Sequence, residues 1–429
     1  MYDWAASAMQ TTVMVAVFPI YFVKVAGAGL AEGGATQRLA TLNTVALVVI
    51  ALASPVLGAI SDYGGTKKRF IAAFMLLGVG AVAGMFFVQR GDLTLASWLF
   101  VLSLIGVAGS FVFYEALLPH LASGPEIDRV STAGYALGYV GGGLLLALNL
   151  AWIQKPAWFG LPAGPQLSGA EATLPARLAF LSVAAWWLVF SVPLFRRVPE
   201  PPARLEPDER RGESPVRMAF VRLGETFREL RGYRQAFLML LAFLIYNDGI
   251  QTIIKMATAY GTELGIDQSA LIGAILLVQF VGIPCSFLFG MLAGRIGAKR
   301  ALFLGLLAYT AISILGYYMK TAVHFYMLAG LVGMVQGGTQ ALSRSLFASM
   351  VPQHKSGEFF GFFSVFEKFA GIFGPLIFAG TIAATGSSRN AILSVIGFFA
   401  VGAAILAFVD LEAGRKEAAA AEAAVQSAG

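Results

Sequence analysis

The sequence predicts an all-α polytopic membrane protein with twelve transmembrane helices in two pseudo-symmetric six-helix bundles. Apolar residues make up 58% of the 429 positions and charged residues 13%, whereas soluble domains carry about 25% charged residues. Windows of roughly 20 apolar residues, enough to cross a hydrocarbon core about 30 Å thick, recur about twelve times along the chain. A glycine-rich basic hairpin also occurs twice, once in each half. Repeats of this kind are typical of duplicated helix bundles.

Each apolar window is expected to be a helix, because backbone amides in lipid must bond within their own segment unless a barrel closes. No alternating pattern typical of barrel strands is present. We therefore expect spans near residues 4–24, 39–60, 70–89, 94–120, 130–152, 176–195, 236–260, 268–293, 300–319, 322–348, 359–384 and 390–409.

One long polar interruption divides six spans from six. We expect an N-terminal bundle at 1–195, a central linker on the inner side at 196–234, a C-terminal bundle at 235–410 and an inner tail at 411–429. Apolar residues at helical spacing in the linker favour a helix lying on the membrane surface, and a disordered charged linker is the alternative. These residues are Val216, Phe220, Leu223, Phe227 and Leu230. The tail is expected to be a frayed helix.

The net charge of +6 is explained by topology. With both termini inside, about 20 Lys and Arg fall in inner loops and tails and about 7 in outer loops. The basic residues lack the interleaved aromatics of a nucleic-acid surface. We expect a monomer in the bacterial cytoplasmic (inner) membrane, with both termini cytoplasmic, lipid contacts and no nucleic-acid partner. Cys285 is the only cysteine, which excludes a disulfide or a thiolate metal site within the chain.

The repeated hairpin is a candidate gate. Glycine at a helix end lets two helices approach, an acid can bond free amides at the start of a neighbouring helix, and basic residues hold the loop at the inner face. The second copy has Gly294 where the first has Asp62, so only Asp62 can act as a latch. The gating candidates in the two copies are Gly58, Asp62, Lys67, Lys68, Arg69, Gly290 and Arg295.

The first copy resembles the signature loop of the major facilitator superfamily, G-x-L-x-D-x-x-G-x-[KR]-[KR], with Ile60 and Thr66 as departures. Three further motifs resemble the Atg22-like (UMF1) branch of that superfamily: Tyr2-Asp3-Trp4, Tyr246-Asn247-Asp248 and Gln336-Gly-Gly-Thr-Gln340. The resemblance implies the major facilitator fold and transport of a small solute by alternating access. Fungal members that it resembles release amino acids from the vacuole. Relatives tend to carry another helical turn before Tyr2, which suggests either a late start or a trimmed chain.

Charged side chains inside the spans are the main candidates for a solute site, because each costs at least about 2.5–3.5 kcal/mol at mid-membrane. In the superfamily's arrangement, spans one, four, seven and ten line a central cavity, and five of the seven intramembrane charges lie on them. Glu367 and Lys368 on span eleven are expected to be structural. The candidates for substrate binding or coupling are Asp3, Gln10, Tyr114, Glu115, Tyr139, Tyr246, Asn247, Asp248, Gln251, Lys255, Gln336 and Gln340.

Two pairings carry the mechanistic hypotheses. Glu115, where the family usually has Asn, and Arg344 lie at matching depth in spans four and ten. We expect them to pair when the inner side closes, with a permanent ion pair or an end charge reaching the headgroups as alternatives. Asp248 and Lys255 share a helical face with Gln251, where they either meet the charged ends of an amino acid or neutralise one another. Glu115 and Asp248 are also the candidates for proton coupling.

The expected function is secondary active transport of a small polar solute, an amino acid by resemblance, with efflux favoured and protons as a candidate coupling ion. The alternatives are an exporter of organic cations or drugs and a non-transporting solute sensor with the same fold. Walker-type, metalloprotease and esterase motifs are absent from the sequence. We therefore expect neither an enzyme nor a bound cofactor or metal.

Overall fold

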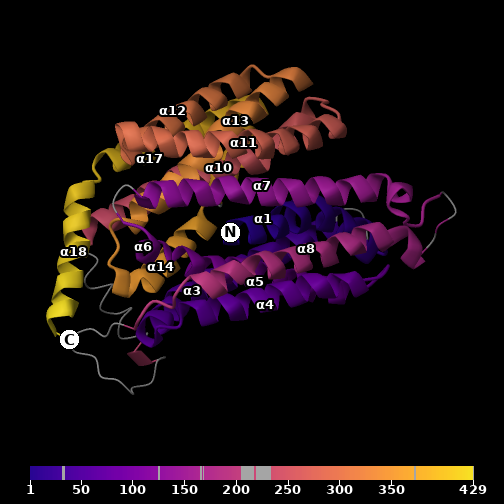
Figure 1. Ribbon diagram of the computed structural model, residues 1–429. Coiled ribbons are helices and arrows are strands. Elements are labelled where there is room, and N and C mark those ends of the chain that lie inside the picture. The colour runs from indigo at the N-terminus through magenta and orange to yellow at the C-terminus, as the bar shows by residue number, and fades with distance from the viewer. Residues whose placement is uncertain are drawn as a thin grey trace. The chain divides into compact units, whose positions relative to one another are not determined.

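The computed structural model describes residues 1–30, 34–123, 126–164, 167, 169–203, 217–218, 233–371 and 373–428. Every regular element in this part of the chain is a helix (Figure 1), which confirms the expected all-α fold class. Within the described residues, ten helical stretches are long and apolar enough to cross a membrane. They are Tyr2–Ala26, Arg38–Gly64, Lys67–Phe87, Leu93–Leu121, Glu126–Gln154, Gly169–Arg197, Arg234–Ala257, Gly273–Ile296, Ala298–Tyr317 and Arg389–Ala407.

The other two expected spans differ from these ten for identifiable reasons. Helix α13 (Ala322–Ala348) has 27 residues, and its polar positions, Arg344 among them, make it less apolar than the others. The expected span 359–384 is divided into α14 (Ser356–Phe369) and α15 (Phe373–Thr385). We call the two pieces together the broken span.

The first half of the chain contains helices α1 to α8. Span one is a composite of α1 (Tyr2–Ala8) and α2 (Phe18–Tyr21), each followed by a π-helical segment, Met9–Val17 and Phe22–Ala26. The wider π geometry occurs often at functional sites. The remaining helices are α3 (Gly34–Gly64), α4 (Lys67–Gly84), α5 (Leu93–Glu115), α6 (Leu118–Leu121), α7 (Glu126–Gln154) and α8 (Gly169–Arg197).

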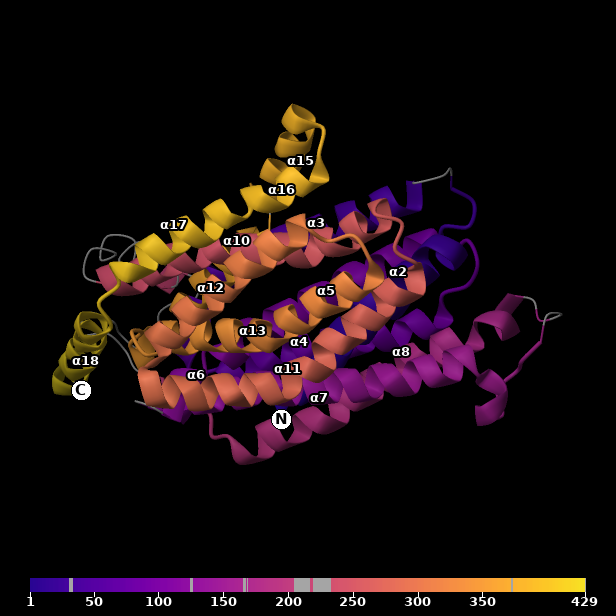
Figure 2. The same cartoon turned by 90° about the horizontal axis from the view of Figure 1, so that it is seen from above.

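The second half contains α10 (Arg234–Glu263), α11 (Gln268–Ile296), α12 (Ala298–Tyr317), α13, α14, α15, α16 (Ser388–Ser394), α17 (Ile396–Ala407) and α18 (Leu411–Ala428). Helix α13 packs against α11 and α12, and α17 packs along α10 (Figure 1). Helix α15 packs against α16 (Figure 2). The expected tail is a helix, α18, and it turns away from the direction of α17 in both views.

The chain packs as two compact units. The first unit contains Met1–Ala53, Thr66–Tyr114 and Leu137–Glu200, and the second contains Ser54–Gly65, Glu115–Ala136 and Pro201–Gly429. Residues from the ends of α3, α5 and α7 thus pack with the C-terminal half of the sequence. The boundaries expected from hydropathy, at 196–234, stay a prediction. The surface helix expected over Val216–Leu230 lies outside the described residues apart from positions 217–218.

Close helix packing in the first unit depends on glycine. A Cβ atom added to Gly106 on α5 would lie 2.4 Å from the Cα atom of Gly78 on α4. One added to Gly141 on α7 would lie 2.3 Å from the carbonyl oxygen of Trp4 on α1. These distances are far below van der Waals contact, so the backbones approach each other only because the side chains are absent, as in other membrane bundles.

We predict that Gly106→Ala destabilises the protein because the methyl group must displace the α4 backbone. Overpacking of this kind costs about 1–3 kcal/mol, measurable by denaturant unfolding in detergent. Gly80→Ala on α4 is the matched control, since nothing lies within 4 Å of its added Cβ atom, and it should be neutral or stabilising by up to about 1 kcal/mol. Equal losses in both variants would contradict the close-contact explanation.

Candidate functional site

Asp62 makes the contact that the hairpin motif led us to expect. The side chain lies near the end of α3, is 2% exposed, and accepts hydrogen bonds from the amides of Gly357 (3.0 Å) and Glu358 (2.8 Å). These amides belong to the first turn of α14, where backbone N–H groups have no partner within the helix. Gly58 allows α3 and α14 to approach closely, because a Cβ atom at this position would lie only 2.2 Å from the Gly357 carbonyl oxygen. Whether this contact is a gate stays a prediction.

The residues just before α14 and in its first turn contact further elements of the second unit. We call residues 353–358 the clamp segment. Gln353 donates a hydrogen bond to the Pro119 carbonyl (2.9 Å), and Ser356 is bonded to His120 Nε2 (3.0 Å). Glu422 on α18 accepts from both the amide (3.0 Å) and Nδ1 (2.9 Å) of His354. The clamp segment therefore joins α3, α6 and α18, a role that no sequence motif indicated.

Arg344 and Glu115 meet, but other bonds hold the arginine more closely. Arg344 is 3% exposed, and its Nη1 lies 3.7 Å from Glu115 Oε1. Its Nε and Nη2 donate to the hydroxyl and the carbonyl of Ser131 on α7, both at 3.0 Å. The guanidinium also lies 4.7 Å from the centre of the Tyr135 ring, a cation–π distance. A serine within an apolar span gave no sequence signal of this role.

The other gating candidates are distributed between the two units. Gly290 on α11 approaches α7, since its added Cβ atom would lie 2.3 Å from Thr132 Oγ1. Arg295, at the end of α11, is exposed. In the first unit Lys67 is buried and Arg69 is exposed. The structure therefore brings Gly58, Asp62, Glu115, Arg344 and Gly290 into one unit and leaves the basic residues of the first hairpin in the other.

Lys68 and Lys299 perform the same structural task in the two halves. Lys68 donates to the carbonyls of Phe195 (3.0 Å) and Val198 (2.6 Å) at the end of α8. Lys299 donates to those of Ala407 (3.0 Å) and Val409 (2.6 Å) after α17. Each lysine is the second residue of its helix, and each cation complements carbonyls that lack helical partners. The sequence alignment that pairs Asp62 with Gly294 pairs Lys299 with Lys67. In the structure Lys299 is instead equivalent to Lys68, one residue further along.

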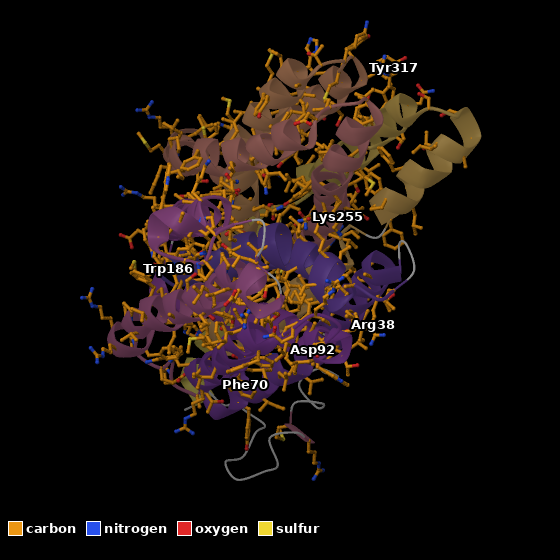
Figure 3. All side chains as sticks on the ribbon, turned by 90° about the vertical axis from the view of Figure 1, so that its right-hand side faces the viewer. Arg38, Phe70, Asp92, Trp186, Lys255 and Tyr317 are labelled. Atoms are coloured by element: carbon orange, nitrogen blue, oxygen red, sulfur yellow. The ribbon has the colours of Figure 1, made fainter. Side chains whose placement is uncertain are left out.

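Asp248 is engaged with the backbone of the broken span. The side chain is 1% exposed. Its Oδ1 accepts from the amides of Gly371 (2.8 Å) and Gly374 (2.9 Å), and its Oδ2 accepts from that of Phe373 (3.1 Å). Lys255 is exposed on the same helix (Figure 3) and donates to the Gly371 carbonyl at 3.3 Å. Backbone amides, rather than Lys255, therefore make the hydrogen bonds to the carboxylate.

An uncharged polar cluster joins α10 to α13. Gln340 donates to the Oδ1 atom of Asn247 (2.7 Å), and the hydroxyl of Tyr246 is bonded to that of Ser343. Asn247 is fully buried, and its Nδ2 has no hydrogen-bond partner among the described residues. Gln251 and Gln336 are partly buried on the same two helices. These groups can offer amide donors and acceptors to a small polar molecule.

The remaining candidates lie in the first unit. Tyr114 donates a hydrogen bond to the carboxylate of Asp3, and the Tyr2 ring packs at 4.8 Å from that of Tyr114. Gln10 is exposed on the π-helical segment, and Tyr139 is partly buried on α7.

On the broken span, the side chain of Lys368 lies outside what the structure describes. In the described part of the chain, no group of three or more His, Cys, Asp or Glu could hold a metal ion.

We predict that Asp62→Asn opens the end of the second unit where α3 meets α14. The amide keeps one acceptor oxygen for two N–H groups and turns a donor toward the other. Losing this charged acceptor should cost about 1–3 kcal/mol, and alkylation of a reporter cysteine should be roughly 5- to 150-fold faster. The reporter is Ala59→Cys, at a fully buried position of α3, in a Cys285→Ser background.

Asp410→Asn is the matched control, because Asp410 caps α18 through the amides of Glu412 and Ala413, both at 3.0 Å, at an exposed position. Its labelling rate should equal that of the parent. Equal acceleration in both variants would mean that general loss of a helix cap, and not release of α3 from α14, exposes the reporter.

The chain is similar to known membrane transporters over most of its length. A family model described as "Vacuole effluxer Atg22 like" matches residues 38–419. An MFS-type transporter of Bacillus subtilis (strain 168), YxiO, is 37% identical over 414 residues, which cover 96% of this chain and 94% of that protein. Autophagy-related protein 22 of Yarrowia lipolytica is 27% identical over 316 residues, and the match covers 68% of this chain and about half, 51%, of the fungal protein.

Solved structures agree on the fold. The proton:xylose symporter XylE matches with a TM-score of 0.68 at 15% identity, covering 95% of this chain and 94% of that chain. FucP in its outward conformation matches with a TM-score of 0.66 at 12% identity, covering 95% and 97%. The relatives are named as transporters, and no enzyme family is indicated. The protein is an MFS-type membrane transporter, and the chain belongs to the Atg22-like family of the major facilitator superfamily.

Proposed function

We propose that the protein is a secondary active transporter that exports a small polar solute, specifically an amino acid, by alternating access. The observation that carries this proposal is the set of polar contacts between the two sequence halves in the second unit. Asp62 holds the first amides of α14, and Ser131 and Glu115 hold Arg344. Side chains that meet through hydrogen bonds can separate and re-form as a transporter cycles.

The polar groups of α10 support a cargo that carries a carboxylate. Lys255 offers an exposed ammonium group, and Gln251 on the same helix is partly buried. The carboxylate of an amino acid would form charge-assisted hydrogen bonds with the Lys255 ammonium group. A purely cationic cargo would meet Lys255 unfavourably. The description of the matching family as vacuole effluxers favours export over uptake.

The membrane assignment follows from the charge distribution and the bacterial relative. The excess of Lys and Arg in alternate loops supports a cytoplasmic position for the hairpins and both termini. The end where Asp62 meets α14 would then be the cytoplasmic end. The bacterial relative supports a position in the cytoplasmic membrane, and protons are the proposed coupling ion.

We predict that purified protein in proteoliposomes exchanges labelled amino acids across the membrane. Vesicles preloaded with an unlabelled amino acid should accumulate the labelled one by counterflow, and empty vesicles should not. A thermal-shift screen beforehand would select the amino acids to test, because a ligand that prefers the folded state raises the melting temperature. Binding without flux would indicate a sensor, and flux of organic cations alone would indicate a drug exporter.

We also predict that the charges of Glu115 and Arg344 act as a pair in transport. Glu115→Arg and Arg344→Glu should each reduce counterflow at least about tenfold, because two like charges then face each other at buried positions. The double variant should recover part of the activity, and only part, since the bonds of Arg344 to Ser131 are not restored. Lys416→Glu on the exposed face of α18 is the control. An additive loss in the double variant would contradict pairing.

A further inference from the structure

The broken span is held open by groups from a single neighbouring helix. Helix α14 ends at Phe369 and α15 begins at Phe373, with Gly371 between them at φ +87°, a backbone conformation that glycine adopts without strain. A break within the membrane leaves amides and carbonyls without helical partners, which is costly in lipid. Asp248 on α10 accepts from three of these amides.

Lys255 binds a free carbonyl group at the same break. Its ammonium group donates to the Gly371 carbonyl at 3.3 Å, two turns along α10 from Asp248. The approach is close on both sides. A Cβ atom added to Gly371 would lie 2.6 Å from Lys255 Nζ, and one added to Gly374 would lie 2.9 Å from Asp248 Oδ1. Helix α10 therefore provides an anion for the free N–H groups and a cation for the free carbonyl.

We propose that Asp248 is a proton-operated switch that couples protonation to the position of α15. This inference rests on the proposed transport function and deepens it by naming the coupling site and the element that moves. An ionised carboxylate only accepts hydrogen bonds, whereas a protonated one carries an O–H donor. A proton on Asp248 removes the negative charge and replaces one acceptor site by a donor, so it weakens the three amide contacts and loosens the start of α15.

Linkage gives the direction of the coupling. The bent form, in which amides surround the oxygens, stabilises the ionised carboxylate, and a form with α15 released stabilises the protonated one. Proton binding therefore favours release, and release favours proton binding by the same factor. Asp248 would then act as a positioning residue for α15 and not as a direct ligand of the solute.

Few other charges act on this carboxylate. Lys255 is the charged group that interacts with it, and helices α15 and α17, which pack on α10, contain no titratable residue. Arg344 on α13 is bonded to Ser131. Helix α14 contributes Glu367, which has other interactions, and Lys368, whose side chain lies outside the described set. Asp248 is thus the group on which a titration of this break should depend.

A spin label at Leu376, which is 64% exposed on α15, tests the proposal in reconstituted full-length protein with Cys285→Ser. The parent should show two spectral components whose ratio changes with pH by up to about tenfold per pH unit, as one titrating group requires. Asp248→Asn should show the mobile component at every pH, because an amide cannot satisfy three donors. Asp248→Glu keeps the charge and should restore a titration with a shifted midpoint.

The control is Glu412→Gln, at an exposed carboxylate of α18, which should titrate like the parent. A spectrum of the parent that does not change with pH, or a titration that survives in Asp248→Asn, would overturn the switch. If Asp248→Asn does not fold, the parent and Asp248→Glu still decide the question. Counterflow measured on the same vesicles separates the two proposals: flux with a constant spectrum rejects only the switch, and a titrating spectrum without flux rejects only transport.

Discussion

Backbone amides that begin a helix need an acceptor, and in lipid that acceptor must come from the protein. The broken span meets this need twice with a carboxylate from another helix. Asp62 on α3 holds the start of α14 through two amides, and Asp248 on α10 holds the start of α15 through three. Both carboxylates are nearly inaccessible to solvent, and both match the positive end of a helix dipole. The position of this span therefore depends on two anions.

The two copies of the hairpin share a structural lysine contact but differ at the candidate gate. Lys68 and Lys299 close the ends of equivalent helices with nearly the same bond lengths. In contrast, the second hairpin has Gly294 at the position of Asp62. The carboxylate contact to a neighbouring helix start is thus made by the first copy alone. The lysine contacts at the helix ends thus occur in both halves, whereas the carboxylate contact occurs in one half. Closure through the carboxylate contact would therefore be asymmetric.

Much of the fold could be predicted because hydropathy and helix length are properties of single segments. The contact of Asp62 was also predictable, since an acid beside glycine in a short loop has few partners other than free amides. The break near Gly371 was not, because glycine is common in membrane helices and the window 359–384 is apolar apart from Glu367 and Lys368. What allows the break is Asp248, more than 120 positions earlier in the chain. The role of Ser131 is equally non-local, because it depends on where Arg344 lies.

Helix α14 physically connects the two anionic contacts. It has 14 residues and hence a length of about 21 Å, with Asp62 at its first turn and the break held by Asp248 just beyond its last. A rigid helix such as α14 transmits displacement along its axis. If α14 and α15 were one continuous helix, they could only move together. A claim of coupling between distant sites requires an element with two arrangements. The glycine break supplies that freedom at a point where a titratable group, Asp248, satisfies the amides.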